Sequence, residues 1–215
     1  MKNTNQISWW FNKFNEEEIN RIAESIRNMH ISQGEVTKEF EQKLAETLDV
    51  SHVICTPSGS MALLLALKVL GIGPGDEVII PNRTWVATAH APSLLGSEII
   101  LVDVESDRPI IDVSLIEERI TEKTKAIIPV HMNGRSCKMR EINAIAKKHD
   151  IYVIEDAAQA FGSKNQDGFL GTQSDIGCFS LSVAKIIASG QGGFAVTNDP
   201  ELAKQLRTTR TNSVE

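Results

Sequence analysis

Short, continuous apolar runs recur along the chain and predict the strands of a buried sheet. Most of these runs do not alternate with polar positions, which is typical of strands that are covered on both faces. Each run ends in small or polar residues. The predicted strands are residues 53–56, 77–80, 99–103, 126–130, 151–155, 176–180 and 193–197.

Segments with a helical period lie between many of these strands. Two amphipathic helices are expected before the first strand, with Thr37 as the N-cap of the second. The order of strand, helix and strand predicts an α/β fold with a mostly parallel seven-stranded sheet and helices on both faces. We see no linker or internal repeat. The predicted helical segments are residues 16–27, 37–48, 60–70, 114–120, 138–148 and 199–210.

The glycine-rich segment Gly71–Gly75 is interpreted as a turn between a helix and a strand. It resembles part of a dinucleotide-binding fingerprint. However, that fingerprint follows a strand and opens a helix, whereas this segment precedes a strand. The order therefore favours the turn over NAD binding.

Composition narrows the class of protein. The 215 residues are 41% hydrophobic and 23% charged, with a net charge of −6, which gives no general attraction to nucleic acid or to an anionic membrane. No signal sequence or membrane-length apolar stretch is seen, so we expect a cytoplasmic protein. Three cysteines, Cys55, Cys137 and Cys178, favour buried free thiols, and their spacing does not suggest a metal site.

One lysine, Lys185, has an unusual setting between an apolar run and the glycine cluster Gly190–Gly193. Partial burial lowers the pKa of a lysine, and the neutral amine that results can form a Schiff base. An exposed loop lysine is the alternative, and it is the commoner case for lysine in general. The remaining polar residues decide between the two.

Ligands of open α/β sheets bind at the carboxyl ends of strands, and three such ends carry suitable side chains. In the first, Gly59 and Ser60 open a predicted helix, where unpaired N–H groups can accept a phosphate. In the second, Asp156 follows a strand and can pair with a protonated ring nitrogen, with Gln159 one helical turn further on. Both segments also fit ordinary helix caps.

The third end leads to Lys185. Ser180 precedes the lysine by five residues and can help to bind a phosphate. Trp85, which follows another predicted strand, can stack on an aromatic ring or fill the core. Together, the lysine, the aspartate, the aromatic ring and the phosphate cup describe a site for pyridoxal phosphate.

The same motifs occur in this order in a known family. The chain resembles the DegT/DnrJ/EryC1/StrS family of pyridoxal-phosphate-dependent sugar aminotransferases, which have the type I aminotransferase fold. The segments that carry the resemblance are residues 31–41, 58–60, 85–89, 129–134, 155–159, 179–185 and 190–193.

The resemblance implies a role for each matching residue. Lys185 matches the Schiff-base lysine, Asp156 the partner of the pyridine nitrogen, and Gln159 the residue near the phenolic oxygen. Trp85 matches the ring-stacking aromatic residue, and the phosphate cup is matched by Gly59, Ser60 and Ser180. Family members generally act on nucleotide-linked keto sugars, usually with glutamate as the amino donor, and form homodimers. One branch carries out a dehydration with histidine in place of the lysine, and Lys185 argues against that branch.

The chain departs from the family pattern in three ways. Ser182 stands where many relatives have histidine or an aromatic residue, and Gln191 replaces a commoner glutamate. Relatives also continue into a smaller C-terminal domain, so residues 1–215 are expected to comprise the N-terminal helices and the large domain only. Two hypotheses stay open: an aminotransferase, or a non-catalytic fragment that binds the cofactor weakly or not at all.

Overall fold

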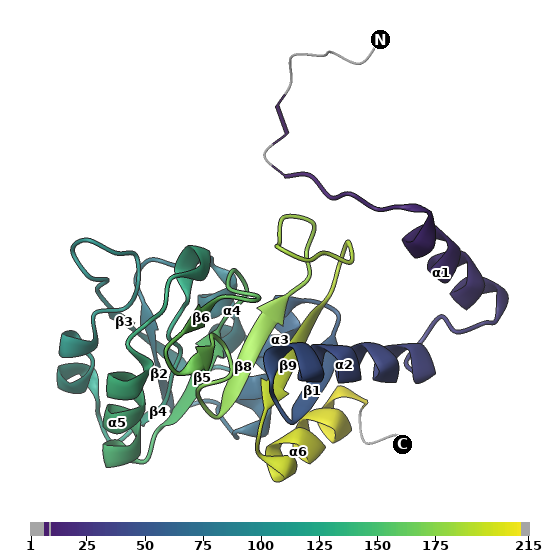
Figure 1. The fold of residues 1–215 in the computed structure, drawn as a ribbon. Coiled ribbons are helices and arrows are strands. Elements are labelled where there is room, and N and C mark those ends of the chain that lie inside the picture. Colours follow the sequence, from purple (N-terminus) through teal and green to yellow (C-terminus); the bar gives the residue numbers. More distant parts are fainter. Residues whose placement is uncertain (1–6, 9, 212–215) are drawn as a thin grey trace.

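Seven strands form one sheet in the computed structural model, which describes residues 7–8 and 10–211 (Figure 1). The strand order is β1-β9-β8-β5-β4-β2-β3. Strand β9 runs antiparallel to both neighbours, and the other pairs are parallel, which confirms the mostly parallel α/β sheet. The strands correspond to the seven predicted ones: β1 (His52–Thr56), β2 (Glu77–Pro81), β3 (Glu98–Val102), β4 (Thr124–Ile127), β5 (Tyr152–Asp156), β8 (Ile176–Ser180) and β9 (Gly193–Thr197).

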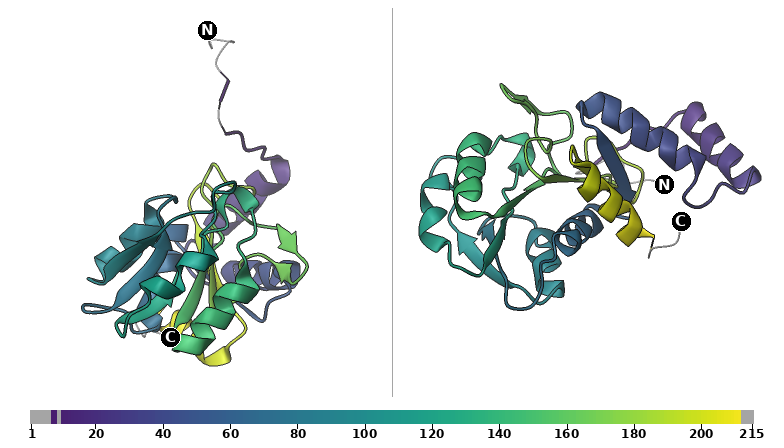
Figure 2. Two further views of the ribbon diagram at one scale, coloured as in Figure 1. Left: turned by 90° about the vertical axis from the view of Figure 1, so that its left-hand side faces the viewer. Right: turned by 90° about the horizontal axis from the view of Figure 1, so that it is seen from below.

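Helices cover both faces of the sheet, as Figure 2 shows from two directions. Along β2, Val78 and Ile80 pack on one helical layer, while Ile79 between them packs on the other. All three side chains are buried, and each contributes about 2 kcal/mol of hydrophobic stabilisation. The first layer contains α3 (Gly59–Val69), α4 (Ala87–Leu94) and α6 (Pro200–Arg210); the second contains α2 (Glu35–Leu48) and α5 (Met139–His149).

Two of the predicted helical segments differ in the structure. Helix α2 has Gly34 as its N-cap, so the prediction of Thr37 as the cap was wrong. Glu35 and Lys38 form an ion pair with 2.7 Å between Nζ and Oε1, which supports an earlier first turn. Residues 114–120 form two short 3₁₀ helices, η1 (Val113–Leu115) and η2 (Glu117–Arg119), instead of an α-helix. A seven-residue segment provides too few hydrogen bonds to offset the cost of starting an α-helix.

The segment Gly71–Gly75 joins α3 to β2 as a turn, in agreement with the sequence-based prediction. Gly71 and Gly75 have φ angles of 75° and 94°, a left-handed conformation that glycine adopts most readily. Because this turn leads from a helix into a strand, it lacks the context of a dinucleotide fingerprint.

Helix α1 (Glu16–Arg27) begins and ends where the sequence predicts, but it stands away from the sheet (Figure 1). Asn15 and Glu18 form a capping box at its start. None of its residues is buried, and its apolar face of Ile19, Ile22 and Ile26 is more than half exposed. Within the described part of the chain, every helix is too short or too polar to cross a membrane.

Strands β1, β2, β4, β5 and β8 point in the same direction, so their carboxyl ends lie along one edge of the sheet. The loop of residues 181–192 leaves this edge after β8 and extends beyond the sheet (Figure 1). Two backbone hydrogen bonds close its base: Leu181 N donates to Gly192 O at 2.8 Å, and Ser189 N donates to Leu181 O at 2.9 Å. The loop carries Lys185.

Candidate active site

Lys185 and Asp156 lie close enough at the carboxyl edge for their charges to interact. Lys185 is neither exposed nor fully buried. Burial lowers the pKa of its ammonium group, and the Asp156 carboxylate opposes this change. The exposed-loop alternative for Lys185 therefore does not describe the structure. A half-buried lysine with a lowered pKa keeps more of its amine neutral, as nucleophilic chemistry requires.

Asp156 is the last residue of β5, and it is only 5% exposed. Its Oδ2 accepts a hydrogen bond from Thr88 Oγ1 at 2.7 Å, and its Oδ1 accepts one from Ala158 N at 3.1 Å. Burial raises the pKa of the Asp156 carboxyl, whereas these hydrogen bonds and the charge of Lys185 act to lower it. The alternative of a helix cap is wrong, because turns and not a helix follow Asp156.

Gln159 lies on that turn, so the expected helical turn between it and Asp156 is absent. Its Oε1 accepts a hydrogen bond from Asn133 N at 2.9 Å. Asn133 has a φ angle of 53°, which is uncommon for a residue other than glycine. Gln159 thereby connects the loop after β5 to the loop after β4.

Gly59, Ser60 and Ser180 meet where α3 begins. A Cβ atom on Gly59 would lie 2.8 Å from Ser180 Cβ, and one on Gly193 would lie 2.5 Å from Gly59 N. The N-cap is Ser58, whose Oγ accepts a hydrogen bond from Met61 N at 3.2 Å, and not Ser60. The Ser60 side chain therefore has no capping role. The N–H groups of Gly59 and Ser60, which precede the capped Met61 N, remain available to an anion.

Trp85 precedes α4, and its side chain is 71% exposed. The alternative that Trp85 fills the core is therefore wrong. The hydroxyl of its sequence neighbour Thr84 shares a hydrogen bond with the Thr88 hydroxyl, with 2.7 Å between the two oxygens. Because Thr88 also binds Asp156, the segment that presents the indole ring is tied to the buried carboxylate.

A second buried network supports the end of β5, and it was not predicted from the sequence. Glu155 accepts hydrogen bonds from Gly171 N, Gln173 N and Ser174 Oγ at 2.7–2.9 Å, and its Oε2 lies 2.8 Å from His131 Nε2. Cys137 N donates to His131 Nδ1, so the ring proton must be on Nε2, where it is donated to Glu155. His131 N in turn donates to Asp156 O at 3.0 Å.

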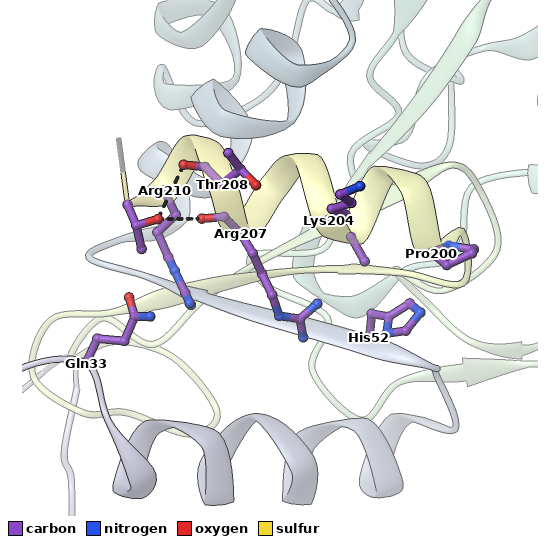
Figure 3. Close-up of a pocket in the computed structure, with 9 residues that line it drawn as sticks. Gln33, His52, Pro200, Lys204, Arg207, Thr208 and Arg210 are labelled. Carbon is purple, nitrogen blue, oxygen red and sulfur yellow. Dashed lines mark hydrogen bonds between the residues drawn. The ribbon is translucent and has the colours of Figure 1, made fainter. Parts of the chain in front are cut away.

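A pocket of about 390 Å³ lies elsewhere, along the outer edge of β1 between α2 and α6 (Figure 3). Arg207 and Arg210 reach from α6 toward β1, where they donate hydrogen bonds to Val53 O and Cys55 O at 3.2 and 3.3 Å. Glu41 from α2 accepts from Cys55 N at 2.8 Å and from Arg210 Nη1 at 2.6 Å. These side chains cover the free edge of the sheet, so their role is structural.

Cys55, Cys137 and Cys178 are free thiols in the described structure, as the sequence predicts, and two of them are buried. Burial raises the pKa of Cys55 to about 12, which keeps its thiol protonated.

Comparisons with known proteins agree with this arrangement. The family model of the DegT/DnrJ/EryC1/StrS aminotransferase family matches residues 12–215. The chain belongs to this family. A GDP-perosamine synthase from Escherichia coli O157:H7 is 44% identical over 171 residues, which cover 80% of this chain and 47% of that protein. A GDP-perosamine synthase from Caulobacter vibrioides is 41% identical over 83% of this chain and 48% of its own length.

Solved structures of related proteins have the same fold as this aminotransferase-family chain. One match is the structure of a putative sugar aminotransferase from Streptococcus pneumoniae in its pyridoxal-phosphate (PLP) form. The match covers 94% of this chain and 57% of that protein's chain, with a TM-score of 0.89 and 31% identity. Another match is a GDP-4-keto-6-deoxymannose-3-dehydratase with a trapped PLP–glutamate geminal diamine. It covers 97% of this chain and 55% of that protein's chain, with a TM-score of 0.90 and 28% identity. The chain spans about half the length of the curated relatives it matches.

Proposed function

We propose that this chain provides the pyridoxal-phosphate site of an aminotransferase that transfers an amino group from an amino acid to a nucleotide-linked keto sugar. The observation that carries the proposal is that half-buried Lys185 lies near buried Asp156 at the carboxyl edge of the sheet, close enough for their charges to interact. The family and the GDP-perosamine synthase relatives support the sugar substrate. Glutamate as the donor is supported by the glutamate trapped on PLP in the dehydratase structure.

The residues at this edge fit the cofactor. Asp156 accepts one hydrogen bond on each oxygen from the described residues, so each oxygen retains a lone pair for a pyridinium N–H. The start of α3, with Gly59, Ser60 and nearby Ser180, offers N–H and hydroxyl groups to the phosphate. The exposed Trp85 ring is free to stack on a pyridine ring.

Each side chain has a defined task in this proposal. When bound, pyridoxal phosphate supplies the aldehyde that receives the amino group and a ring that takes up electrons from the substrate Cα. Lys185 would hold the cofactor through its side-chain amine and would carry a proton to and from the substrate Cα. Asp156 would accept a hydrogen bond from the ring nitrogen and keep it protonated, and the family resemblance assigns Gln159 to the phenolic oxygen.

We also propose that residues 1–215 comprise the N-terminal helices and the large domain, and that the protein acts as a homodimer. The exposed apolar face of α1 supports a partner subunit. A second candidate is a non-catalytic domain that binds the cofactor weakly or not at all.

The test combines attachment with turnover. The protein is mixed with pyridoxal phosphate, reduced with borohydride and digested, and the pyridoxyl group is mapped by mass spectrometry. We expect it on Lys185, and Lys185→Ala should lose both the adduct and the formation of 2-oxoglutarate from glutamate. Adduct formation without turnover would support the second candidate, and a protein with no adduct on Lys185 would exclude the proposed cofactor site.

A further inference from the structure

Asp156 is a buried carboxylate whose charge depends on a few neighbours. Thr88 Oγ1 and Ala158 N donate the hydrogen bonds that its oxygens accept from the described residues. Lys185 and His131 face it as basic groups, and the buried Cys178 thiol is also close enough to feel its charge. Burial raises the pKa of Asp156, so the loss of any donor favours the neutral acid.

Thr88 is the one side-chain hydroxyl among the described residues that reaches this carboxylate. It comes from α4, 68 positions away in the sequence, and is completely buried. A buried hydroxyl carries a single proton, so it can donate in only one direction. When Asp156 is ionised, Thr88 must donate its hydroxyl proton to Oδ2. The Thr88 hydroxyl oxygen then accepts a hydrogen bond from the Thr84 hydroxyl, with 2.7 Å between the two oxygens.

The two threonines therefore form a directed chain from Thr84 through Thr88 to Asp156. If Asp156 became neutral and donated from Oδ2 to Thr88, the Thr88 hydroxyl would have to turn its proton away from Asp156. Hydrogen bonds to charged acceptors are stronger than neutral ones, so the first direction favours the ionised carboxylate. The lone pairs of Asp156 that face away from Thr88 and Ala158 then remain for a ligand.

We propose that Thr88, supported by Thr84, is a positioning residue that keeps Asp156 ionised and turned toward the pyridine nitrogen of the cofactor. This inference rests on the proposed function, because the nitrogen belongs to pyridoxal phosphate. The spacing of the threonines adds a structural link: they flank Trp85, so one segment presents the ring-stacking side chain and also orients the carboxylate.

The experiment begins with cofactor-free protein, where it does not depend on the proposed function. The ionisation of Asp156 is followed by NMR of 13C-labelled aspartate carboxyls, assigned with Asp156→Asn. We expect Thr88→Val to raise the titration midpoint of the Asp156 carboxyl by about 1 pH unit, because the carboxylate loses one hydrogen bond. Thr88→Ser should restore the midpoint, and Thr84→Val should shift it less in the same direction.

The second measurement uses protein loaded with 15N-labelled pyridoxal phosphate. In Thr88→Val the ratio of ring-protonated to carboxyl-protonated forms should fall about tenfold at constant pH, which moves the 15N shift toward that of unprotonated pyridine. The matched control is Ser97→Ala, which removes a buried hydroxyl that donates to Pro92 O at 2.9 Å, beside the opposite end of α4.

The two measurements separate the possible failures. Three results would overturn the role of Thr88. The Asp156 midpoint could be the same in Thr88→Val as in the wild type, it could shift equally in Ser97→Ala, or Thr88→Ser could fail to restore it. If Thr88→Val does not fold, a Thr84→Val variant with a wild-type midpoint would overturn it. Shifted Asp156 midpoints in a protein that never attaches the cofactor would uphold the threonine chain and reject the proposed function.

Discussion

At the scale of single residues, the site places an amine and a carboxylate where both are partly removed from water. Burial disfavours the charged form of Lys185, so its proton leaves at a lower pH than the usual 10.5. Asp156 stabilises the ammonium and limits this change. The opposing effects of burial and of the Asp156 charge keep part of the Lys185 amine neutral. Asp156 keeps the negative charge that would pair with the ring nitrogen of pyridoxal phosphate.

This balance predicts how attachment of pyridoxal phosphate to Lys185 depends on pH. The borohydride-trapped fraction should rise with pH, with a midpoint below 10.5. Asp156→Asn removes the charge that stabilises the ammonium, so its midpoint should be lower still. Exposed Lys38 is an internal control, because its hydrogen bond with Glu35 raises its pKa. A midpoint for Lys185 equal to or above that of Lys38 would contradict the prediction.

Gly193 gives a second prediction at this scale. A Cβ atom there would lie 2.4–2.6 Å from the backbone of Ser58 and Gly59, so the start of α3 would have to move. We expect Gly193→Ala to destabilise the fold by about 1–3 kcal/mol in urea unfolding and to weaken phosphate binding. Gly34→Ala is the control, since nothing lies within 4 Å of its added carbon. Equal affinity of the two variants for inorganic phosphate would argue against a cup at α3.

At the scale of elements, the sequence predicts the strands that have continuous apolar runs, most of which are buried on both faces. All seven strands were predicted because their apolar runs are continuous. Helix α4 was missed because its eight residues include Pro92 and have no clear apolar face. The hairpin of β6 (Lys164–Asn165) and β7 (Gly168–Phe169) was missed because strands of two residues carry no period.

The same limit applies to the site. Lys185, Asp156 and Gln159 follow strands in the chain, so local order was enough to select them. Thr88 was missed as a partner of Asp156, and His131 as a partner of Glu155, because each pair joins segments that are far apart in the sequence. A hydrogen bond across 68 positions leaves no mark on local periodicity.

The edge strand β1 provides a prediction at the element scale. Glu41→Ala would leave Cys55 N and the Arg210 guanidinium without their shared acceptor, and we expect a loss of about 3 kcal/mol in urea unfolding. The exposed edge should also promote aggregation, measured by light scattering. Glu39→Ala on the same helix removes only a surface ion pair with Lys43 and should cost less than about 0.5 kcal/mol. Similar losses in both variants would show that Glu41 does not stabilise the edge.

At the scale of the whole molecule, helix α1 stands out because none of its residues is buried against the rest of the described chain. Its capping box and strongly amphipathic pattern favour a stable helix, yet its apolar side chains contribute nothing to the described core. Ile22 alone is 61% exposed. Monomeric proteins rarely leave such a continuous apolar face in water, so the pattern fits a surface that is covered in the active assembly.

If a second copy of the chain covers this face, Ile22→Asp should weaken self-association about tenfold or more, because it places a charge in an apolar contact. Asn20→Asp is the matched control: it adds the same charge to the same helix, away from the apolar stripe of Ile19, Ile22 and Ile26. Sedimentation velocity over a range of concentrations measures both variants. Because no residue of α1 is buried, the thermal unfolding of the monomer should change little in either variant. A wild-type chain that stays monomeric throughout, or two variants that dissociate equally, would rule out α1 as the homodimer contact.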